Sequence, residues 1–319
     1  MRRFFSFVGA AVAVLSLGAN ALGAERLNGF GPGELRGPYP EEWGFAQEPD
    51  PLDFELGIRY WYSMGSSALN AFGAAYSAKD TSSIAEAFFR IDDNSTASFL
   101  KGQIGYAVKI DGTYTTPRFA GAQTMAGGYI GYGGVDFGML PFGTEGFRVG
   151  AFAGYQYIAD NPDMGRTPFV TLSGGGDSAP NALDINAAKL GVVLNADIGD
   201  RVDLNMEAAV IPYASLSGVY GALYVPDFVF DGNNFTQGSA GNINGRLYGA
   251  SGEVMLGFKP TQNLALRIGA RGWYLTGEAT MDYVARQVGT PANTQSYITN
   301  VSGLEFFRYG ALAEIAGTF

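Results

Sequence analysis

The chain has 319 residues, with 47 glycines, no cysteine and no histidine, and its formal net charge is −10. The acidic balance excludes nucleic acid as a natural partner, because binding to a phosphate backbone needs a basic surface. Without histidine and cysteine, Ser-His-Asp and Cys-His nucleophiles cannot be built, and zinc, copper and haem lack their usual ligands. We therefore expect no cofactor, no metal site and no catalytic residue.

The first 24 residues have the pattern of a secretory signal peptide. Arg2 and Arg3 form a short basic region, and an apolar stretch follows from Phe4 to Leu17. Ala19-Asn20-Ala21 has the small residues of an A-x-A cleavage site. The pattern predicts that residues 1–24 direct export and are removed. The alternative, an uncleaved anchor, would need a longer apolar stretch.

Residues 25–51 contain five prolines, which rule out a regular helix or strand: Pro32, Pro38, Pro40, Pro49 and Pro51. We interpret this segment as a Pro/Gly-rich periplasmic arm that leads into the first strand. A short plug folded into the mouth of a barrel is the alternative interpretation.

Residues 52–319 show a repeated period of two, which predicts strands. Turn signals separate ten such segments: 53–64, 84–91, 98–110, 122–140, 147–157, 185–198, 202–215, 248–258, 264–277 and 306–319. Short turns alternate with longer polar segments, at 65–82, 111–121, 158–184, 216–246 and 278–304. The pattern predicts an all-β chain that folds as a closed antiparallel transmembrane barrel of about ten strands, within a range of eight to twelve.

The last segment carries the clearest membrane pattern. Counting back from Phe319, every second residue is apolar, including Tyr309 and Ile315, whereas the intervening positions include Arg308 and Glu314. We interpret the apolar face as touching lipid and the polar face as lining the barrel. This ending resembles the C-terminal strand of bacterial outer-membrane β-barrel proteins. The resemblance implies that Tyr309, Ile315 and Phe319 form the signal that the barrel-assembly machinery reads.

A barrel of this kind predicts a place in the cell outer membrane, with short periplasmic turns and long extracellular loops. The expected partners are outer-membrane lipids and lipopolysaccharide, in addition to the assembly machinery. We expect the protein to be a monomer.

Two segments share the pattern G-x-R-x-W-Y-x-x-G. They are Gly57–Gly65 in the first predicted strand and Gly269–Gly277 in the ninth. In a closed ring of ten, both strands flank the tenth. Alternation then places the Arg and Trp of each copy inside the barrel, and the Tyr outside in an aromatic girdle.

Charged residues recur at the inward positions of the predicted strands. The set is Glu55, Arg59, Glu86, Arg90, Lys101, Lys109, Arg148, Lys189, Glu207, Glu253, Arg267, Arg271, Arg308 and Glu314. Two interpretations follow. The charges pair with one another and plug the lumen, or they line a narrow pore that selects small solutes and, since nine of the fourteen are basic, prefers anions.

The ten-stranded layout and the segments IRYWYSMG (58–65) and ARGWYLTG (270–277) resemble the omptin proteases. Omptins use an Asp–His pair together with further aspartates. Asp111 follows the third predicted strand, where an omptin acid would lie, but the chain has no histidine to partner it. The outer-membrane phospholipase, palmitoyltransferase and lipid A deacylase families also depend on a histidine. The resemblance therefore implies a ten-stranded barrel with long outer loops, but not the histidine-dependent catalysis of these families.

We predict a non-enzymatic, porin-like narrow channel with a charge-lined lumen. The alternative is a structural or surface-interaction barrel with a closed lumen that acts through its extracellular loops. A third alternative, an omptin-like hydrolase, is opposed by the missing histidine.

Overall fold

The computed structural model describes residues 51–125, 127–144 and 146–319. The predicted signal peptide and nearly all of the predicted arm lie outside these ranges, and both remain predictions. Most of the described residues lie in strands. Within the same ranges, no helix is long and apolar enough to cross a membrane.

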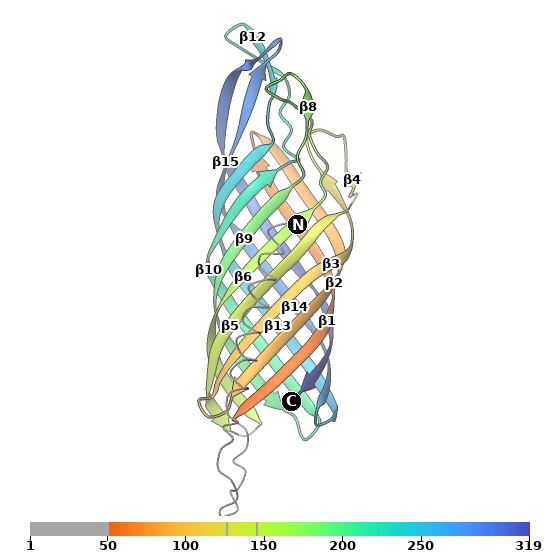
Figure 1. The fold of residues 1–319 in the computed structure, drawn as a ribbon, viewed down its shortest axis with the longest axis vertical. Helices are drawn as coiled ribbons and strands as arrows, with labels where there is room; N and C mark the ends of the chain where they lie inside the picture. The colour runs from red at the N-terminus through yellow and green to blue at the C-terminus, as the bar shows by residue number, and fades with distance from the viewer. Residues whose placement is uncertain (1–50, 126, 145) are drawn as a thin grey trace, which may run out of the picture. The chain divides into compact units, whose positions relative to one another are not determined.

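Ten long antiparallel strands form a closed ring in the described part of the chain (Figure 1). In ring order they are β1 (Leu52–Ala71), β2 (Ala74–Asp93), β3 (Ser98–Thr115), β5 (Gly128–Thr144), β6 (Phe147–Pro162), β9 (Ala182–Asp197), β10 (Val202–Tyr220), β13 (Gly241–Thr261), β14 (Leu264–Gln287) and β15 (Thr290–Thr318). Pairing of β15 with β1 closes the ring, with Arg59 opposite Glu314. The predicted all-β antiparallel barrel of about ten strands is confirmed.

The connections differ between the two ends of the barrel. At one end, called the turn end below, they are short and lie at 94–97, 145–146, 198–201 and 262–263. At the other, the loop end, three connections carry the short strands β4 (Gln123–Thr124), β7 (Phe169–Val170), β8 (Gly176–Asp177), β11 (Phe228–Phe230) and β12 (Asn233–Gln237). At the turn end, Ser95 and Thr96 donate hydrogen bonds that lower the pKa of the Asp93 carboxyl.

Two of the five segments predicted as long loops are strand hairpins. Residues 65–82 continue β1 and β2 to a turn at Phe72 and Gly73, and residues 278–304 continue β14 and β15 to a second turn. The predicted strands ended too early because the outward positions become small or polar there, as at Ser66 and Thr280, while large apolar residues such as Met281 occupy inward positions instead. The backbone ladder continues regardless of that change.

Large apolar side chains cover the outer face of the ring. They include Leu56, Ile58, Phe137, Leu190, Val192, Val210, Leu256, Ile268 and Ile315, all exposed. Exposed tyrosines follow toward the loop end: Tyr60, Tyr62, Tyr106, Tyr155, Tyr213, Tyr248, Tyr274 and Tyr309. Exposed phenylalanines lie toward the turn end: Phe54, Phe142, Phe147, Phe258 and Phe319. An apolar band between two aromatic girdles is the outer surface of a membrane-spanning barrel.

A bulge in β3 reverses the alternation of its side chains. Val108 and Lys109 are both exposed, and the pairing with β2 shifts between Ser83 and Ile84. A bulge sets two residues of one strand against one of its partner, so side chains beyond it change face. The prediction that Lys109 points inward is therefore wrong. Its ammonium lies on the outer face and pairs with Asp111.

Candidate functional site

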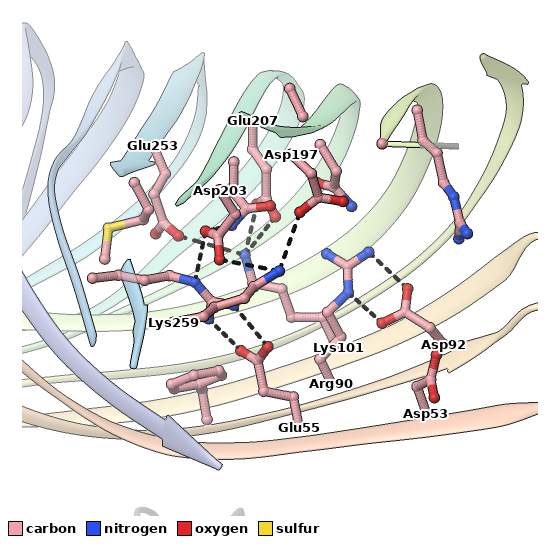
Figure 2. A pocket seen from close by; sticks show the side chains of 18 of the residues that line it. Asp53, Glu55, Arg90, Asp92, Lys101, Asp197, Asp203, Glu207, Glu253 and Lys259 are labelled. Carbon is pink, nitrogen blue, oxygen red and sulfur yellow. Dashed lines mark hydrogen bonds and ion pairs between the residues drawn. The ribbon is translucent and has the colours of Figure 1, made fainter. Parts of the chain in front are cut away.

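A polar vestibule lies inside the barrel at its turn end. This cavity of about 270 Å³ extends from the turn residues Asn94 and Gly146 to Arg59 inside the ring. Figure 2 shows its acidic and basic side chains, which face one another across the lumen: Asp53, Glu55, Arg90, Asp92, Lys101, Asp197, Asp203, Glu207, Glu253 and Lys259. Arg59, Arg148 and Arg267 also line the vestibule, which brings the lining to seven acidic and six basic side chains, so the vestibule is polar without a strong net charge.

Arg267 on β14 binds carboxylates from three other strands at the wall of the vestibule. Its guanidinium donates to both oxygens of Glu55 at 2.6 and 3.0 Å, to Glu314 at 2.6 Å and to Asp203 at 3.0 Å. These carboxylates come from β1, β15 and β10. One buried arginine thus pairs with carboxylates from both sides of the β1–β15 seam. Such pairing is necessary because a buried charge without a hydrogen-bonded partner is strongly destabilising.

A second network of ion pairs crosses the lumen beyond the vestibule. Arg59 pairs with Glu86 at 3.1 Å and with Glu253 at 3.6 Å, and also donates to Glu314. Arg271 pairs with the same Glu86 and Glu253. The side chain of Glu86 is fully buried. We call Arg59, Arg271, Glu86 and Glu253 the charge layer, because their side chains meet across the lumen from β1, β2, β13 and β14.

Two lysines extend the pairing to the far side of the ring. Lys101 donates to both oxygens of Glu207 at 2.7 Å, and its ammonium lies 3.8 Å from Glu253 in the charge layer. Lys189 pairs with Asp136 at 2.8 Å. Both ammonium groups are almost completely buried. The lumen charges therefore neutralise one another rather than presenting a row of free basic groups.

Three aromatic rings lie directly beyond the charge layer. Trp61 and Trp273 meet edge to face with ring centroids 4.9 Å apart, and Tyr132 contacts them at 5.8 and 5.4 Å. The guanidinium of Arg271 lies 5.6 Å from the ring of Trp61, within cation–π range. Tyr132 donates its hydroxyl to Glu86. We call Trp61, Trp273 and Tyr132 the aromatic layer.

The lumen toward the loop end is filled as well. Arg308 has no exposed surface, and its guanidinium binds Asp80 and Asp160 at 2.8–3.0 Å and Ser63 at 3.0 Å. Beyond it lies an apolar cluster, which includes Leu69, Tyr76, Ile130, Ile158, Leu183, Ile185, Ile211, Leu216, Tyr220, Ile243, Leu247, Leu275, Met281, Leu304 and Phe306. The interior at this end resembles a soluble core.

Nine of the ten candidate lumen residues are buried or half-buried inside the ring: Glu55, Arg59, Lys189, Glu207, Glu253, Arg267, Arg271, Arg308 and Glu314. Arg148 lines the rim of the vestibule at the turn end, where its side chain is exposed and donates to Asn94 at 3.1 Å. Arg308 does not contact Arg59 or Arg271 and lies in a separate network with Asp80 and Asp160. Asp111 lies within β3 rather than after it, and its side chain is exposed.

Several lumen partners were not among the candidates. Asp80 and Asp160 lie in segments read as loops, and Asp136 lies in a glycine-rich strand whose alternation is obscured. The signal that would have found them is electrostatic: a buried Arg308 or Lys189 needs a carboxylate partner. Tyr132 was missed because the candidates were selected by charge, and its side chain is uncharged.

The residues of the predicted insertion signal lie on the outer face of β15 and directly after its end. Tyr309, Ile315 and Phe319 are exposed by 44%, 52% and 79%. Their side chains therefore belong to the apolar band and its girdles. Recognition by the assembly machinery remains a prediction.

No family model matches the chain, and no curated protein has a matching sequence. Among solved structures, the outer membrane protease OmpT from Escherichia coli is similar with a TM-score of 0.53 at 10% identity, over 85% of this chain and 98% of that one. The Pseudomonas putida toluene transporter TodX has a TM-score of 0.32 at 11% identity, over 85% and 91%. A Pseudomonas aeruginosa FadL homologue has a TM-score of 0.27 at 9% identity, over 85% and 90%. The likeness to OmpT shows that the chain has the fold of an outer-membrane β-barrel.

Proposed function

We propose that this chain is a closed, non-conducting barrel of the cell outer membrane that acts through its extracellular end. The apolar band between two aromatic girdles supports the membrane location. The turn end then faces the periplasm and the loop end faces the outside. Of the two interpretations of the lumen charges, this proposal adopts the one in which the charges pair with one another and plug the lumen.

The observation that carries the proposal is the filling of the lumen between the vestibule and the loop end. A solute that leaves the vestibule meets first the charge layer and then the aromatic layer, in which Trp61 and Trp273 are 0% and 3% exposed. Two cavities found beyond the vestibule hold only about 30 and 10 Å³. Each has room for about one water molecule. Passage would require both indoles and several ion pairs to move.

The proposed function is not enzymatic. OmpT is called a protease, but the Asp–His pair of omptins has no counterpart in a chain without histidine. Asp111, the residue at the corresponding strand, has its carboxylate paired with Lys109 on the outer face. On the outer face, neither the Asp111 carboxylate nor the Lys109 ammonium can activate a water molecule for attack on a peptide bond.

A narrow channel is the second candidate, and the vestibule is the observation in its favour. The 270 Å³ cavity would admit water and small solutes as far as Arg59 and Lys101. In a closed barrel the same vestibule is open to the periplasm only and does not continue through the lumen.

Solute flux into liposomes separates the two candidates. The purified chain is refolded into liposomes loaded with an impermeant dextran, and swelling is followed in isotonic arabinose or glycine. A heat-dependent gel shift confirms insertion. The closed barrel predicts swelling no faster than that of protein-free liposomes. Swelling at the rate of an open porin reconstituted in parallel would overturn the proposal and favour the channel.

A further inference from the structure

The hairpin of β14 and β15 extends beyond the end of β1. The last pair between β1 and β15 is Asn70 with Ser302, whereas pairing of β15 with β14 continues to Thr290. Figure 1 shows this hairpin rising above the rest of the ring. In the part of the chain that the structure describes, residues 290–301 of β15 thus have a strand on one side only.

Apart from Pro291 and the register shifts at its two ends, the exposed edge lacks the features that normally block strand addition. Native edge strands are protected by charged side chains, prolines or bulges. Residues 292–301 contain no charged residue and no proline. From Thr294 to Val301 the register with β14 runs without a bulge. The segment Thr294–Val301, called the open edge below, is therefore a regular strand with free backbone groups.

The inner face of the hairpin is held by aromatic packing. Tyr297 of the open edge stacks on Tyr283 at 5.5 Å and meets Phe228 edge to face at 5.4 Å. Phe72, from the turn between β1 and β2, packs against Tyr283 at 5.0 Å. Burial raises the pKa of Tyr283 to about 12. These contacts order the open edge before anything binds, which reduces the entropy lost on binding.

The outer face of the open edge offers one apolar side chain among polar ones. Ile298 is 76% exposed, and its neighbours on that face, Ser296 and Asn300, are exposed as well. A strand added along the edge would gain backbone hydrogen bonds and would cover Ile298 with the side chain opposite. The edge has no charge with which a charged segment could pair.

We propose that the open edge binds an extended, uncharged segment of a partner protein as an additional antiparallel strand. This inference rests on the proposed function, since it names the partner class of the extracellular end. The bound segment continues the ladder that β1 leaves at Asn70. An apolar, β-branched residue of the segment lies beside Ile298.

A second copy of the chain fits the open edge less well. Two copies in one membrane have the same orientation, so an axis along the membrane normal relates them. Their open edges then run in the same direction and would pair parallel, which is the less stable arrangement. A separate segment is free to approach in the antiparallel direction.

The test uses the refolded full chain and a random twelve-residue peptide library displayed on phage. Peptides enriched on the wild type are synthesised, and their Kd is measured on the wild type and two variants. Ser296→Lys/Ile298→Lys puts two charges on the open edge. Thr280→Lys is the matched control, because it lies exposed on β14 of the same hairpin but is paired on both sides.

We expect enriched peptides to be uncharged and to alternate apolar with polar residues. The double variant should weaken binding about tenfold or more, since it removes an apolar contact and places charge on the edge. Thr280→Lys should leave the Kd unchanged, and bound peptide should slow amide exchange in residues 294–301. Each chain's gel shift confirms folding.

Three results would overturn the inference. They are no enrichment, equal binding to the double variant, and exchange protection that falls elsewhere. Dimerisation in detergent that the double variant abolishes would identify a second copy as the occupant and equally reject a separate partner. Each of these results concerns binding at the open edge and leaves the closed lumen unaffected. Failure of the proposed function is recognised separately, by arabinose flux into liposomes.

Discussion

Trp61 and Trp273 meet edge to face at 4.9 Å in the middle of the lumen, although β15 separates their strands. They occupy the same place in the two copies of G-x-R-x-W-Y-x-x-G. The arginine two residues earlier in each copy binds the same two carboxylates, Glu86 and Glu253. The repeated pattern thus contributes the arginines of the charge layer and the indoles of the aromatic layer.

Removal of both indoles should open the barrel. Trp61→Ala/Trp273→Ala deletes most of the aromatic layer, and each truncation should cost about 3 kcal/mol or more of stability. We expect arabinose-dependent swelling of liposomes that the wild type does not show. Tyr62→Ala is the control, because it follows Trp61 in the pattern but faces outward. An inserted double variant that stays impermeable would show that the aromatic layer is not the barrier.

Loss of one arginine from the charge layer should destabilise the barrel strongly. Arg271→Ala leaves the buried carboxylates of Glu86 and Glu253 with fewer cations, a change that typically costs about 3–5 kcal/mol. The midpoint of urea unfolding in detergent should fall accordingly. Lys109→Ala serves as control, since its ion pair is exposed on the outer face. Equal midpoints for the two variants would argue against a structural role for the layer.

Arg308 should not be replaceable by lysine. Its planar guanidinium binds Asp80 and Asp160 at once, with hydrogen bonds to both oxygens of each. A lysine keeps the charge but not this geometry. Arg308→Lys should lose at least one charge-assisted hydrogen bond, about 1.5–3 kcal/mol. The temperature of the gel shift measures this loss, and an unchanged temperature would mean that charge alone suffices.

Gly310 should tolerate no side chain at the seam between β1 and β15. A Cβ there would lie 2.0 Å from the carbonyl oxygen of Tyr62 and 2.9 Å from Nε1 of Trp61. Gly310→Ala should therefore cost about 1–3 kcal/mol and slow refolding. Gly252→Ala is the matched control, because its nearest contact would be an ordinary 3.5 Å. Equal refolding yields would contradict the close approach at the seam.

The alternation of residues was sufficient to predict the closed ring and the face of the strands on which the candidate lumen residues and the tyrosines lie. It failed where one residue breaks the period, as at the bulge that turns Lys109 outward. It also failed where strands leave the bilayer, because the outer face there no longer carries large apolar residues and the inner face carries them instead, as at Leu69 and Met281. Asp80 and Asp160 were missed for that reason, although both lie in strands.

Whether the lumen was closed could not be predicted from the strand pattern. Inward charges such as Arg59 and Glu314 suit a pore and a plug equally, and only their mutual distances separate the two. The apolar cluster at the loop end is formed by residues such as Leu69 and Leu304, which lay in segments read as loops. The vestibule depends on how far each side chain reaches across the ring, which alternation does not describe.

Single-channel recording of the refolded wild type in a planar bilayer tests the closed lumen most directly. Insertion is confirmed by the heat-dependent gel shift. With the charge and aromatic layers in place, we predict a membrane as silent as the protein-free bilayer, and discrete steps once Trp61 and Trp273 are both alanine. Stable steps from the wild type, with an ion selectivity that Arg59→Ala alters, would contradict the closed barrel and establish a pore lined by the charge layer.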